Sequence, residues 1–451
     1  MKSTLALFLL GSLLLMGAEA LFEQGHTSWS IRLPSAASEA EVFAADELSR
    51  VLRKISGAQF PVVRGDGAAL SNGPGFELGT PESLPRLQDE ADELGLSDSD
   101  HDAIVIRTQA DGVLLAGSNP RSVIYAVHEF LRRELGVRWL WFGEDGEFAP
   151  SRLRHELGEV DYRFTPPFRY RDMTPVMVGQ NRDTEIWFMR SGMNMGSRTL
   201  DLRDRLGFLK NDIGHFCSLS RQWDPDIDHL YEEHPEYFQL VGGKRQFLRD
   251  GQNRGCWSSP GYAEYLVRLN IRLAAERRLH LYSTIPADTS QRCQCPECQG
   301  NPLDPSAQWF QFYGKLIEGM RREMPQLKFY GTAYHEYQAV PGFDLTPLGL
   351  EFVAYCNYDR CQVHRLDDSQ CHHSRESLDM LRRWSEKAPL GVYGYHFDTL
   401  KITRETGYYY MPLWNIVADE IRHLRQLDGV YCKTEFVMDY YQPGLGGKMP
   451  A

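Results

Sequence analysis

The segment Y-S-T-I-P-A-D-T-S-Q-R-C-Q-C-P-E-C, residues 282–298, is the part of the chain that most directly indicates its fold. It continues an expected strand over 279–284, turns at Pro286, presents Asp288 and then places three cysteines close together. A carboxylate just beyond the carboxyl end of a strand, on a loop with its own crosslink or metal, is typical of a parallel α/β barrel. The segment therefore predicts that the surrounding chain forms such a barrel.

Length and composition limit the class of the protein. With 451 residues, the chain is too long for one ordinary hydrophobic core, so two domains are expected. A formal net charge of -12 leaves no basic surplus to neutralise phosphates, which argues against a nucleic-acid partner or an anionic membrane. The aromatic content of 12% suits the flat apolar faces of sugar rings. A soluble protein with a carbohydrate partner fits these values.

Residues 1–20 are predicted to be a secretory signal peptide. Lys2 precedes an apolar run over 5–16, and the small residues Ala18 and Ala20 suit cleavage. The run is too short for a comfortable membrane span. We therefore expect a secreted or periplasmic protein that is not inserted in a membrane after cleavage, in an oxidising compartment where its 9 cysteines could pair.

Residues 21–150 are expected to form a small β/α domain. Ser38 and Glu41 form a capping box before an amphipathic helix that Gly57 ends. The acidic segment 81–102 has no period and is expected to be a solvated loop. The other expected elements are strands over 29–33, 60–63 and 75–79, a hairpin across Asp111-Gly112, and a helix from Pro120 to Gly136. Because this region has no titratable cluster, we expect a non-catalytic companion of a catalytic domain.

Residues 165–451 alternate between expected strands and helices. After a first strand at 168–173 and a stretch without clear elements, strands are expected at 279–284, 328–334, 350–356, 390–395 and 430–434, with helices after Ser259 and Ser306 and over 378–384 and 416–424. Such βαβ units form parallel sheets, and roughly 285 residues suffice for a (β/α)8 TIM-type barrel of about 250 residues. A short Gly- and Pro-rich segment follows Glu435, so a closing C-terminal helix has little room. Either the barrel is finished irregularly or the chain lacks a C-terminal region that its relatives have, and we expect the second.

Acidic residues recur at the expected carboxyl ends of these strands, where barrel enzymes hold their active sites: Asp288, Glu336, Asp359, Asp398 and Glu435. Glycoside hydrolysis requires two carboxyl groups across the scissile bond, one protonated and one ionised. One acid at a strand end is usually a loop cap or a surface charge, but five together favour a site. We predict Asp288 as the general acid and Glu435 as its partner, with Asp398 and Glu336 as alternatives.

The same regions carry side chains suited to binding sugars. Arginine pairs with a uronate carboxylate through two hydrogen bonds, and tyrosine and histidine can bond hydroxyls. A single histidine is more often structural, so only the clustering has weight. The predicted substrate-binding residues are Trp187, Arg190, His215, Tyr334, His335, Arg360, His364, Tyr395 and His396.

Cys293, Cys295 and Cys298 are spaced like one corner of a metal site, and a fourth ligand would come from Cys256 or a histidine. In an exported protein, disulfides are the competing explanation. We expect a structural role, by disulfide or zinc, because three sulfur ligands suit closed sites, and we expect the chemistry to require no cofactor. Cys361 and Cys371 are candidates for a second crosslink. The sequence contains no P-loop, dinucleotide fingerprint or G-x-S-x-G elbow.

Two groups of motifs resemble known families. The segment G-S-N-P-R-S at 117–122, within its order of strands and helices, resembles the N-terminal domain of α-glucuronidases, which is related to the second domain of β-N-acetylhexosaminidases and precedes a barrel there. The C-x-C-P-x-C loop, A-Y-x-x-Y at 333–337 and R-C-x-x-H at 360–364 resemble an uncharacterised bacterial family of secreted proteins with a domain of unknown function.

These resemblances imply a carbohydrate-active protein. In the better known barrel relatives the general acid lies at the end of the fourth strand, which corresponds to Asp288 here, although those relatives commonly carry glutamate. We therefore expect a secreted glycoside hydrolase that acts on a poly- or oligosaccharide. The alternatives are a non-catalytic carbohydrate-binding protein on the same scaffold and, less favoured, a metal-dependent hydrolase that uses the cysteine loop.

Overall fold

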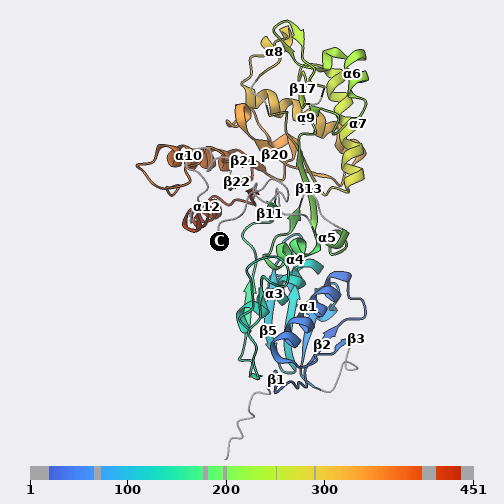
Figure 1. Ribbon diagram of the computed structural model, residues 1–451, viewed down its shortest axis with the longest axis vertical. Coiled ribbons are helices and arrows are strands. Elements are labelled where there is room, and N and C mark those ends of the chain that lie inside the picture. The colour runs from blue at the N-terminus through green and yellow to red at the C-terminus, as the bar shows by residue number, and fades with distance from the viewer. Residues whose placement is uncertain are drawn as a thin grey trace, which may run out of the picture. The chain divides into compact units, whose positions relative to one another are not determined.

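The structure is a computed structural model that describes residues 20–65, 73–175, 181–196, 201–249, 251–288, 291–398 and 413–437 (Figure 1). The expected signal peptide lies outside these ranges except for its last residue. The chain divides into two compact units, and Asp100–Asp102, Trp141–Gly146 and Thr165–Ala451 form the second. None of the helices in these ranges is both long and apolar enough to cross a membrane.

The first unit is built on a six-stranded sheet with the order β10-β5-β6-β4-β2-β3. Its strands are β2 (Ser30–Leu33), β3 (Val62–Arg64), β4 (Gly75–Gly79), β5 (Ile104–Gln109), β6 (Gly112–Gly117) and β10 (Asp161–Phe164). The pairs among β2, β3, β4 and β6 are parallel, whereas β5 pairs antiparallel with both β6 and β10. Two short antiparallel pairs complete the unit, β1 (Phe22–Glu23) with β9 (Arg154–His155) and β7 (Arg138–Trp139) with β8 (Glu147–Phe148).

Helices α1 (Glu39–Ser56) and α3 (Pro120–Glu134) pack against this sheet and against each other. The predicted capping box is confirmed, because the Ser38 side chain accepts from the Glu41 amide and the Glu41 carboxylate accepts from the Ser38 amide. Asn119 caps α3 in the same way, with Pro120 in the first turn. Local sequence signals therefore fix where both helices begin.

The prediction of a solvated loop over 81–102 is wrong. The segment contains the 3-10 turn η2 (Pro85–Leu87) and the one-turn helix α2 (Ala91–Leu94). Leu87, Leu94 and Leu96 are buried in one cluster with Val105 and Leu114. The elements are too short for their apolar residues to show a helical period in the sequence. Burial of these residues nevertheless holds the segment against the sheet.

The second unit contains two parallel sheets. One has the order β11-β23-β22-β21-β20 and the other β12-β13-β18-β19, and every neighbouring pair is parallel. The strands are β11 (Tyr170–Pro175), β12 (Met195–Gly196), β13 (Leu209–Gly214), β18 (Leu281–Thr284), β19 (Lys328–Phe329), β20 (Gly331–Ala333), β21 (Val353–Cys356), β22 (Leu390–Asp398) and β23 (Tyr431–Val437). Only Tyr330 separates β19 from β20. Its amide donates to the Tyr282 carbonyl, and the next amide, of Gly331, donates to the Phe352 carbonyl of the other sheet.

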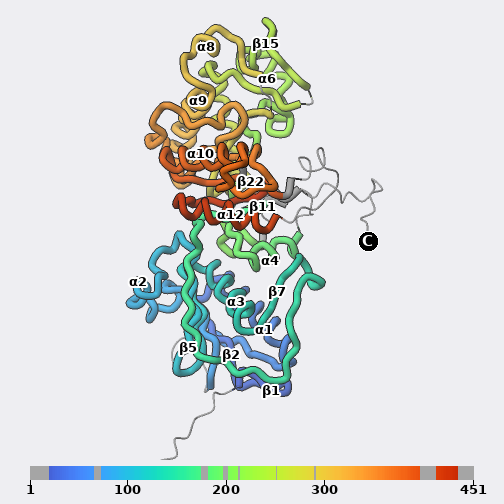
Figure 2. The backbone as a smooth tube through the Cα atoms, turned by 90° about the vertical axis from the view of Figure 1, so that its left-hand side faces the viewer, coloured from blue at the N-terminus to red at the C-terminus, as the bar shows by residue number. Residues whose placement is uncertain are grey.

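Helices connect these strands, which makes the unit a mixed α/β structure. The longer helices are α4 (Arg182–Arg190), α7 (Pro260–Arg277), α9 (Pro305–Glu323), α10 (His372–Lys387) and α12 (Trp414–Gln426). Figure 2 shows α10 and α12 beside β22, which both contact. The shorter elements are α5 (Asp201–Arg205), α6 (Ile227–Glu233), α8 (Pro296–Gln299), η3 (Pro235–Tyr237), η4 (His335–Tyr337), η5 (Thr346–Leu348), and the antiparallel pairs β14 (Ser218–Leu219) with β17 (Asn253–Arg254) and β15 (Leu240–Val241) with β16 (Lys244–Arg245).

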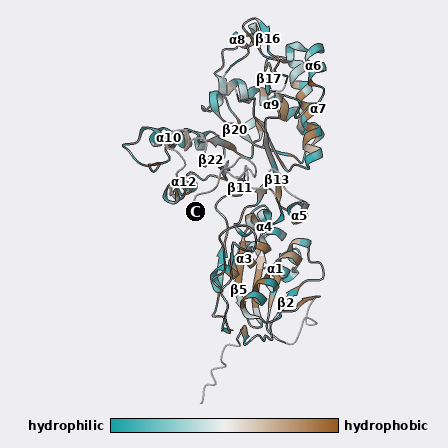
Figure 3. Ribbon diagram, viewed as in Figure 1, coloured by the Kyte–Doolittle hydropathy of each residue, from teal (hydrophilic) through white to brown (hydrophobic). Residues whose placement is uncertain are grey.

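Each unit has its own core. Figure 3 shows hydrophobic residues, in brown, along β5 and α3 of the first unit. In the second unit, one cluster of buried residues draws on strands of both sheets and consists of Tyr170, Met195, Leu281, Tyr330, Phe352, Ala354 and Tyr431. A buried ion pair also joins two strands of this unit, because Lys433 Nζ of β23 lies 3.3 Å from an Asp172 carboxylate oxygen of β11 and both side chains are 1% exposed.

We predict that Lys433→Met lowers the free energy of unfolding by ~3–5 kcal/mol, because it leaves the Asp172 carboxylate buried without its partner. The double variant Asp172→Asn/Lys433→Met is expected to recover part of this loss, since no uncompensated charge remains. Chemical denaturation followed by tryptophan fluorescence measures both effects. Lys315→Met, at an exposed position of α9, is the control and should change little. Equal stability of Lys433→Met and the wild type would contradict the prediction.

Candidate functional site

Three of the predicted site residues follow the carboxyl ends of strands in the second unit. His215 comes directly after β13, Asp288 lies shortly after β18, and Glu336 lies in η4 shortly after β20. The strands β13 and β18 pair in parallel with Gly214 opposite Thr284. Since the carboxyl ends of parallel strands share one edge of a sheet, the pairing brings His215 and the Asp288 loop together.

His215 and Asp288 form a direct contact. The imidazole Nε2 lies 3.4 Å from a carboxylate oxygen of Asp288, and Nδ1 lies 2.7 Å from the Pro286 carbonyl oxygen. A carbonyl oxygen only accepts, so Nδ1 carries a hydrogen and donates it, which leaves Nε2 facing the carboxyl group. The Asp288 side chain is 55% exposed. The contact therefore places an imidazole that is held by a backbone carbonyl beside a carboxyl group that is open to solvent.

Glu336 is held by an arginine that was not among the sequence-predicted site residues. Arg254, at the end of β17, is only 3% exposed, and its Nη2 donates to the Glu336 carboxylate. Its Nη1 donates to the Gln291 carbonyl oxygen at 2.8 Å, and its guanidinium lies 5.3 Å from the centre of the Trp257 ring. A charge-assisted hydrogen bond from a buried guanidinium fixes the position of the Glu336 carboxylate. The sequence gives only a weak signal for this role of Arg254, which is its position two residues before the predicted ligand Cys256.

The charges of both carboxyl groups affect the pKa of one buried tyrosine, Tyr337. Burial is the main cause that raises the pKa of the Tyr337 hydroxyl well above its usual value. The charges of Glu336 and Asp288 raise this pKa further, whereas the Arg254 guanidinium lowers it. Both acids therefore lie within electrostatic range of the same buried hydroxyl.

Arg360 and His396, which the sequence predicts as substrate contacts, both lie against the carboxylate of Glu420. Arg360 Nε lies 2.7 Å from one carboxylate oxygen of Glu420, and His396 Nε2 lies 2.9 Å from the other. All three side chains are buried, which leaves almost no surface for a sugar to contact. Burial acts to raise the pKa of Glu420, but His396, Arg360 and Asn357 outweigh it and hold the pKa at about 2. Glu420, on α12, was not predicted from the sequence.

The other predicted substrate-binding residues lie at several places in the second unit. The Tyr334 and His335 rings have centres 3.9 Å apart at η4 and are tilted by 51°, and His335 is exposed with a φ of 47°. Tyr395 of β22 packs edge-on against Tyr358. His364 is exposed, with Nδ1 3.3 Å from the Cys361 sulfur. Trp187 and Arg190 lie on α4, where the Trp187 ring packs near Trp141.

The two other predicted carboxylates are described only in their backbone. Asp398 ends β22, and Glu435 lies within β23, where it pairs with Thr174 of β11. Their side chains lie outside the described part of the chain. Asp359, which follows β21, is exposed. Among the predicted carboxylates, Asp288 and Glu336 are thus the two for which the structure shows a contact with a basic side chain.

Four cysteines cluster in the second unit. The sulfur atoms of Cys256, Cys293, Cys295 and Cys298 all lie within 4.8 Å of one another. Of the two candidates for a fourth ligand, Cys256 or a histidine, the structure thus places Cys256 with the other three cysteines. Contacts with Cys256 and Cys298 lower the pKa of the Cys293 thiol well below its usual value. No cysteine in the described part of the chain forms a disulfide.

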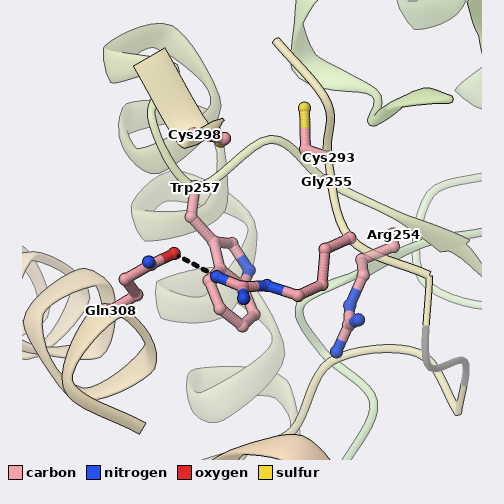
Figure 4. A pocket seen from close by; sticks show the side chains of 7 residues that line it. Arg254, Gly255, Trp257, Cys293, Cys298 and Gln308 are labelled. Carbon is pink, nitrogen blue, oxygen red and sulfur yellow. Dashed lines mark hydrogen bonds between the residues drawn. The ribbon is translucent and has the colours of Figure 1, made fainter. Parts of the chain in front are cut away.

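A small cavity lies between the cysteines and the arginine that holds Glu336. Figure 4 shows Arg254, Trp257 and Gln308 around it, with Cys293 and Cys298 at its edge. The dashed hydrogen bond joins Gln308 to Arg292 at 2.7 Å.

Two further groups could hold a metal ion, Cys361 with His364 and Cys371, and Asp367 with Asp419 and His423.

We predict that Glu420→Gln lowers the free energy of unfolding by ~3–5 kcal/mol at neutral pH, because the buried Arg360 loses its anionic partner. The pKa of Glu420 in the folded chain, about 2, lies below its ordinary value of 4.5. The carboxylate therefore stabilises the fold above pH 4.5, and this contribution is lost as the pH falls from 4.5 towards 2. The stability difference from the wild type should shrink over that window in denaturation curves. Glu386→Gln, at an exposed position of α10, is the control. A difference that does not change with pH would contradict the assignment.

Comparison with solved structures shows the fold of the chain. A family GH115 4-O-methyl-alpha-glucuronidase, BtGH115A, with specificity for decorated arabinogalactans, is 14% identical with a TM-score of 0.52, over 92% of this chain and 54% of that one. A GH138 enzyme targeting pectin rhamnogalacturonan II is 9% identical with a TM-score of 0.49, over 90% of this chain and 58% of that one. A family 89 glycoside hydrolase from Clostridium perfringens is 11% identical with a TM-score of 0.47, over 88% of this chain and 47% of that one.

The chain thus spans about half the length of these glycoside hydrolases. The likeness to BtGH115A supports a glycosidase-like fold and, at this identity, says nothing more. No curated protein matches the chain in sequence. One family model does match, over residues 141–438, and the chain therefore belongs to the family described as Domain of unknown function (DUF4838).

Proposed function

We propose that the chain is a glycoside hydrolase that cleaves a poly- or oligosaccharide with the carboxyl groups of Asp288 and Glu336. The observation that carries this proposal is the pair itself: two acids that follow the strands β18 and β20, each in contact with a basic side chain, and both within electrostatic range of Tyr337. Paired carboxyl groups are what glycoside hydrolysis requires. The glycosidase-like fold adds support. Export by the signal predicted at residues 1–20 would bring the protein to such a substrate.

We further propose that the two sheets of the second unit belong to one eight-stranded barrel, with β19 and β20 as halves of one strand. Three observations support this proposal. β11 pairs with β23, so the last strand meets the first. The Asn194 amide donates to the Arg171 carbonyl oxygen at 3.1 Å, which joins β11 to the residue just before β12, and these are the end strands of the two sheets. The buried cluster around Tyr330 draws on strands of both sheets, as the interior of a closed barrel would.

The two acids are suited to different roles. Asp288 is partly exposed and faces His215 Nε2, so a proton held between them can be delivered to the oxygen of the leaving sugar. Glu336 is fixed by Arg254 and acts as the ionised partner, either as nucleophile or as the base that activates water. Asp398 and Glu435, which the sequence also predicts, remain alternatives for this second role.

We predict that Asp288→Asn and Glu336→Gln each lower kcat/KM by about 10²–10⁴-fold while circular dichroism stays unchanged, because each removes one carboxyl group from the chemistry. The measurement is sugar release from plant and algal polysaccharides and chromogenic glycosides. Asp379→Asn, at an exposed position of α10, is the matched control and should keep full activity.

Full activity in both variants would overturn the assignment of these two acids. A wild-type protein that releases no sugar but binds one of the polysaccharides would instead be a non-catalytic carbohydrate-binding protein.

A further inference from the structure

We propose that Cys256, Cys293, Cys295 and Cys298 bind one Zn²⁺ ion as four thiolates, and that this ion fixes the loop carrying Asp288. Metal binding by the cysteines stands on geometry alone. Only the consequence for Asp288 rests on the proposed function. The ligand class is a borderline-soft divalent ion that accepts tetrahedral sulfur coordination, for which Zn²⁺ is the usual occupant.

The sulfur positions match a tetrahedral site. The vertices of a tetrahedron are about 1.6 times as far from each other as from the centre, so Zn–S bonds of about 2.3 Å place sulfur atoms about 3.8 Å apart. The Cys256 sulfur lies 3.6 Å from that of Cys295 and 3.7 Å from that of Cys298. A disulfide would require about 2.05 Å between two of them. All four atoms lie within 4.8 Å of one another, which a pairwise crosslink would not require.

The chain around the cysteines donates hydrogen bonds to sulfur. The Leu240 amide donates to the Cys293 sulfur at 3.3 Å, and the Cys298 amide donates to the Cys295 sulfur at 3.4 Å. The Ser258 hydroxyl lies 3.0 Å from the Cys298 sulfur. Groups that donate to sulfur favour thiolates and orient them as metal ligands. The protein therefore supplies both the ligands and their supporting contacts.

The site is closed, which points to a structural ion. Four cysteines fill all four positions of a tetrahedral zinc ion, so no position remains for water or substrate. The cluster of Cys361, His364 and Cys371 differs, because it has three ligands and includes an exposed histidine. This difference makes the second cluster a useful control.

The ion would anchor both carboxyl groups of the proposed active site. Cys293 lies on the loop that carries Asp288, and Cys256 lies next to the segment that carries Arg254. Arg254 donates both to the Gln291 carbonyl of that loop and to the Glu336 carboxylate. One ion bound to Cys256 and Cys293 thus joins the two segments whose relative position sets that of Asp288 and Glu336.

The first test measures metal binding without any activity assay. The purified full chain should contain one zinc per molecule by elemental analysis, and Co²⁺ exchanged for zinc should give the absorption of a tetrahedral tetrathiolate site. Cys295→Ser should lose this metal, whereas Cys361→Ser, in the other cluster, should retain it. Because Cys295→Ser could fail to fold, Cys295→His is the second variant, and it should keep the ion with a cobalt spectrum changed by one nitrogen ligand.

A wild-type chain that takes up neither ion, or one in which any of the four cysteines is found in a disulfide, would overturn the site. Loss of metal in Cys361→Ser with retention in Cys295→Ser would also overturn it.

The claim that the ion positions Asp288 is tested separately. Removal of zinc with a chelator should lower turnover by about 100-fold, the loss that a misplacement of about 1 Å can cause. Unchanged turnover in the metal-free chain would overturn that claim and leave the metal site intact.

Discussion

Parallel pairing of neighbouring strands is the constraint on which the candidate site depends. Strands that run the same way end at the same edge, so the residues that follow β13 and β18 come from distant parts of the sequence yet lie side by side. His215 contacts Asp288 because Gly214 pairs with Thr284. A shift of register by one residue would turn the side chains of one strand to the other face and separate this pair.

Buried charged groups hold several of the sequence-predicted site residues in place. Arg254 holds Glu336 from one side, while Glu420 holds Arg360 and His396 where β22 and α12 meet. Buried ion pairs add little net stability compared with apolar residues of similar size. Removing one partner, however, lowers the free energy of unfolding strongly, so such pairs favour a single arrangement of the loops that carry them. In the proposed function, these contacts and the four cysteines would together give the rigid support that a pair of catalytic carboxyl groups requires.

Regular elements were predictable from the sequence because their signals are local. The capping boxes and the buried runs of β18, β21 and β22 are examples. β13 was not located, since its Lys210 and Asn211 are buried polar residues that interrupt the apolar pattern, and β12 has only two residues. The role of Arg254 was not predictable because its partner Glu336 is distant in the sequence. Helical periodicity placed 416–424 in a helix but could not show that Glu420 faces Arg360 and His396.

The central claim is that Asp288 and Glu336 flank one glycosidic bond. A crystal structure of the Asp288→Asn variant with a bound oligosaccharide tests it most directly. The account predicts a sugar between residues 288 and 336, with their side-chain carbonyl carbons about 5 to 10 Å apart. A sugar bound elsewhere in the second unit, or a separation well beyond that range, would contradict it.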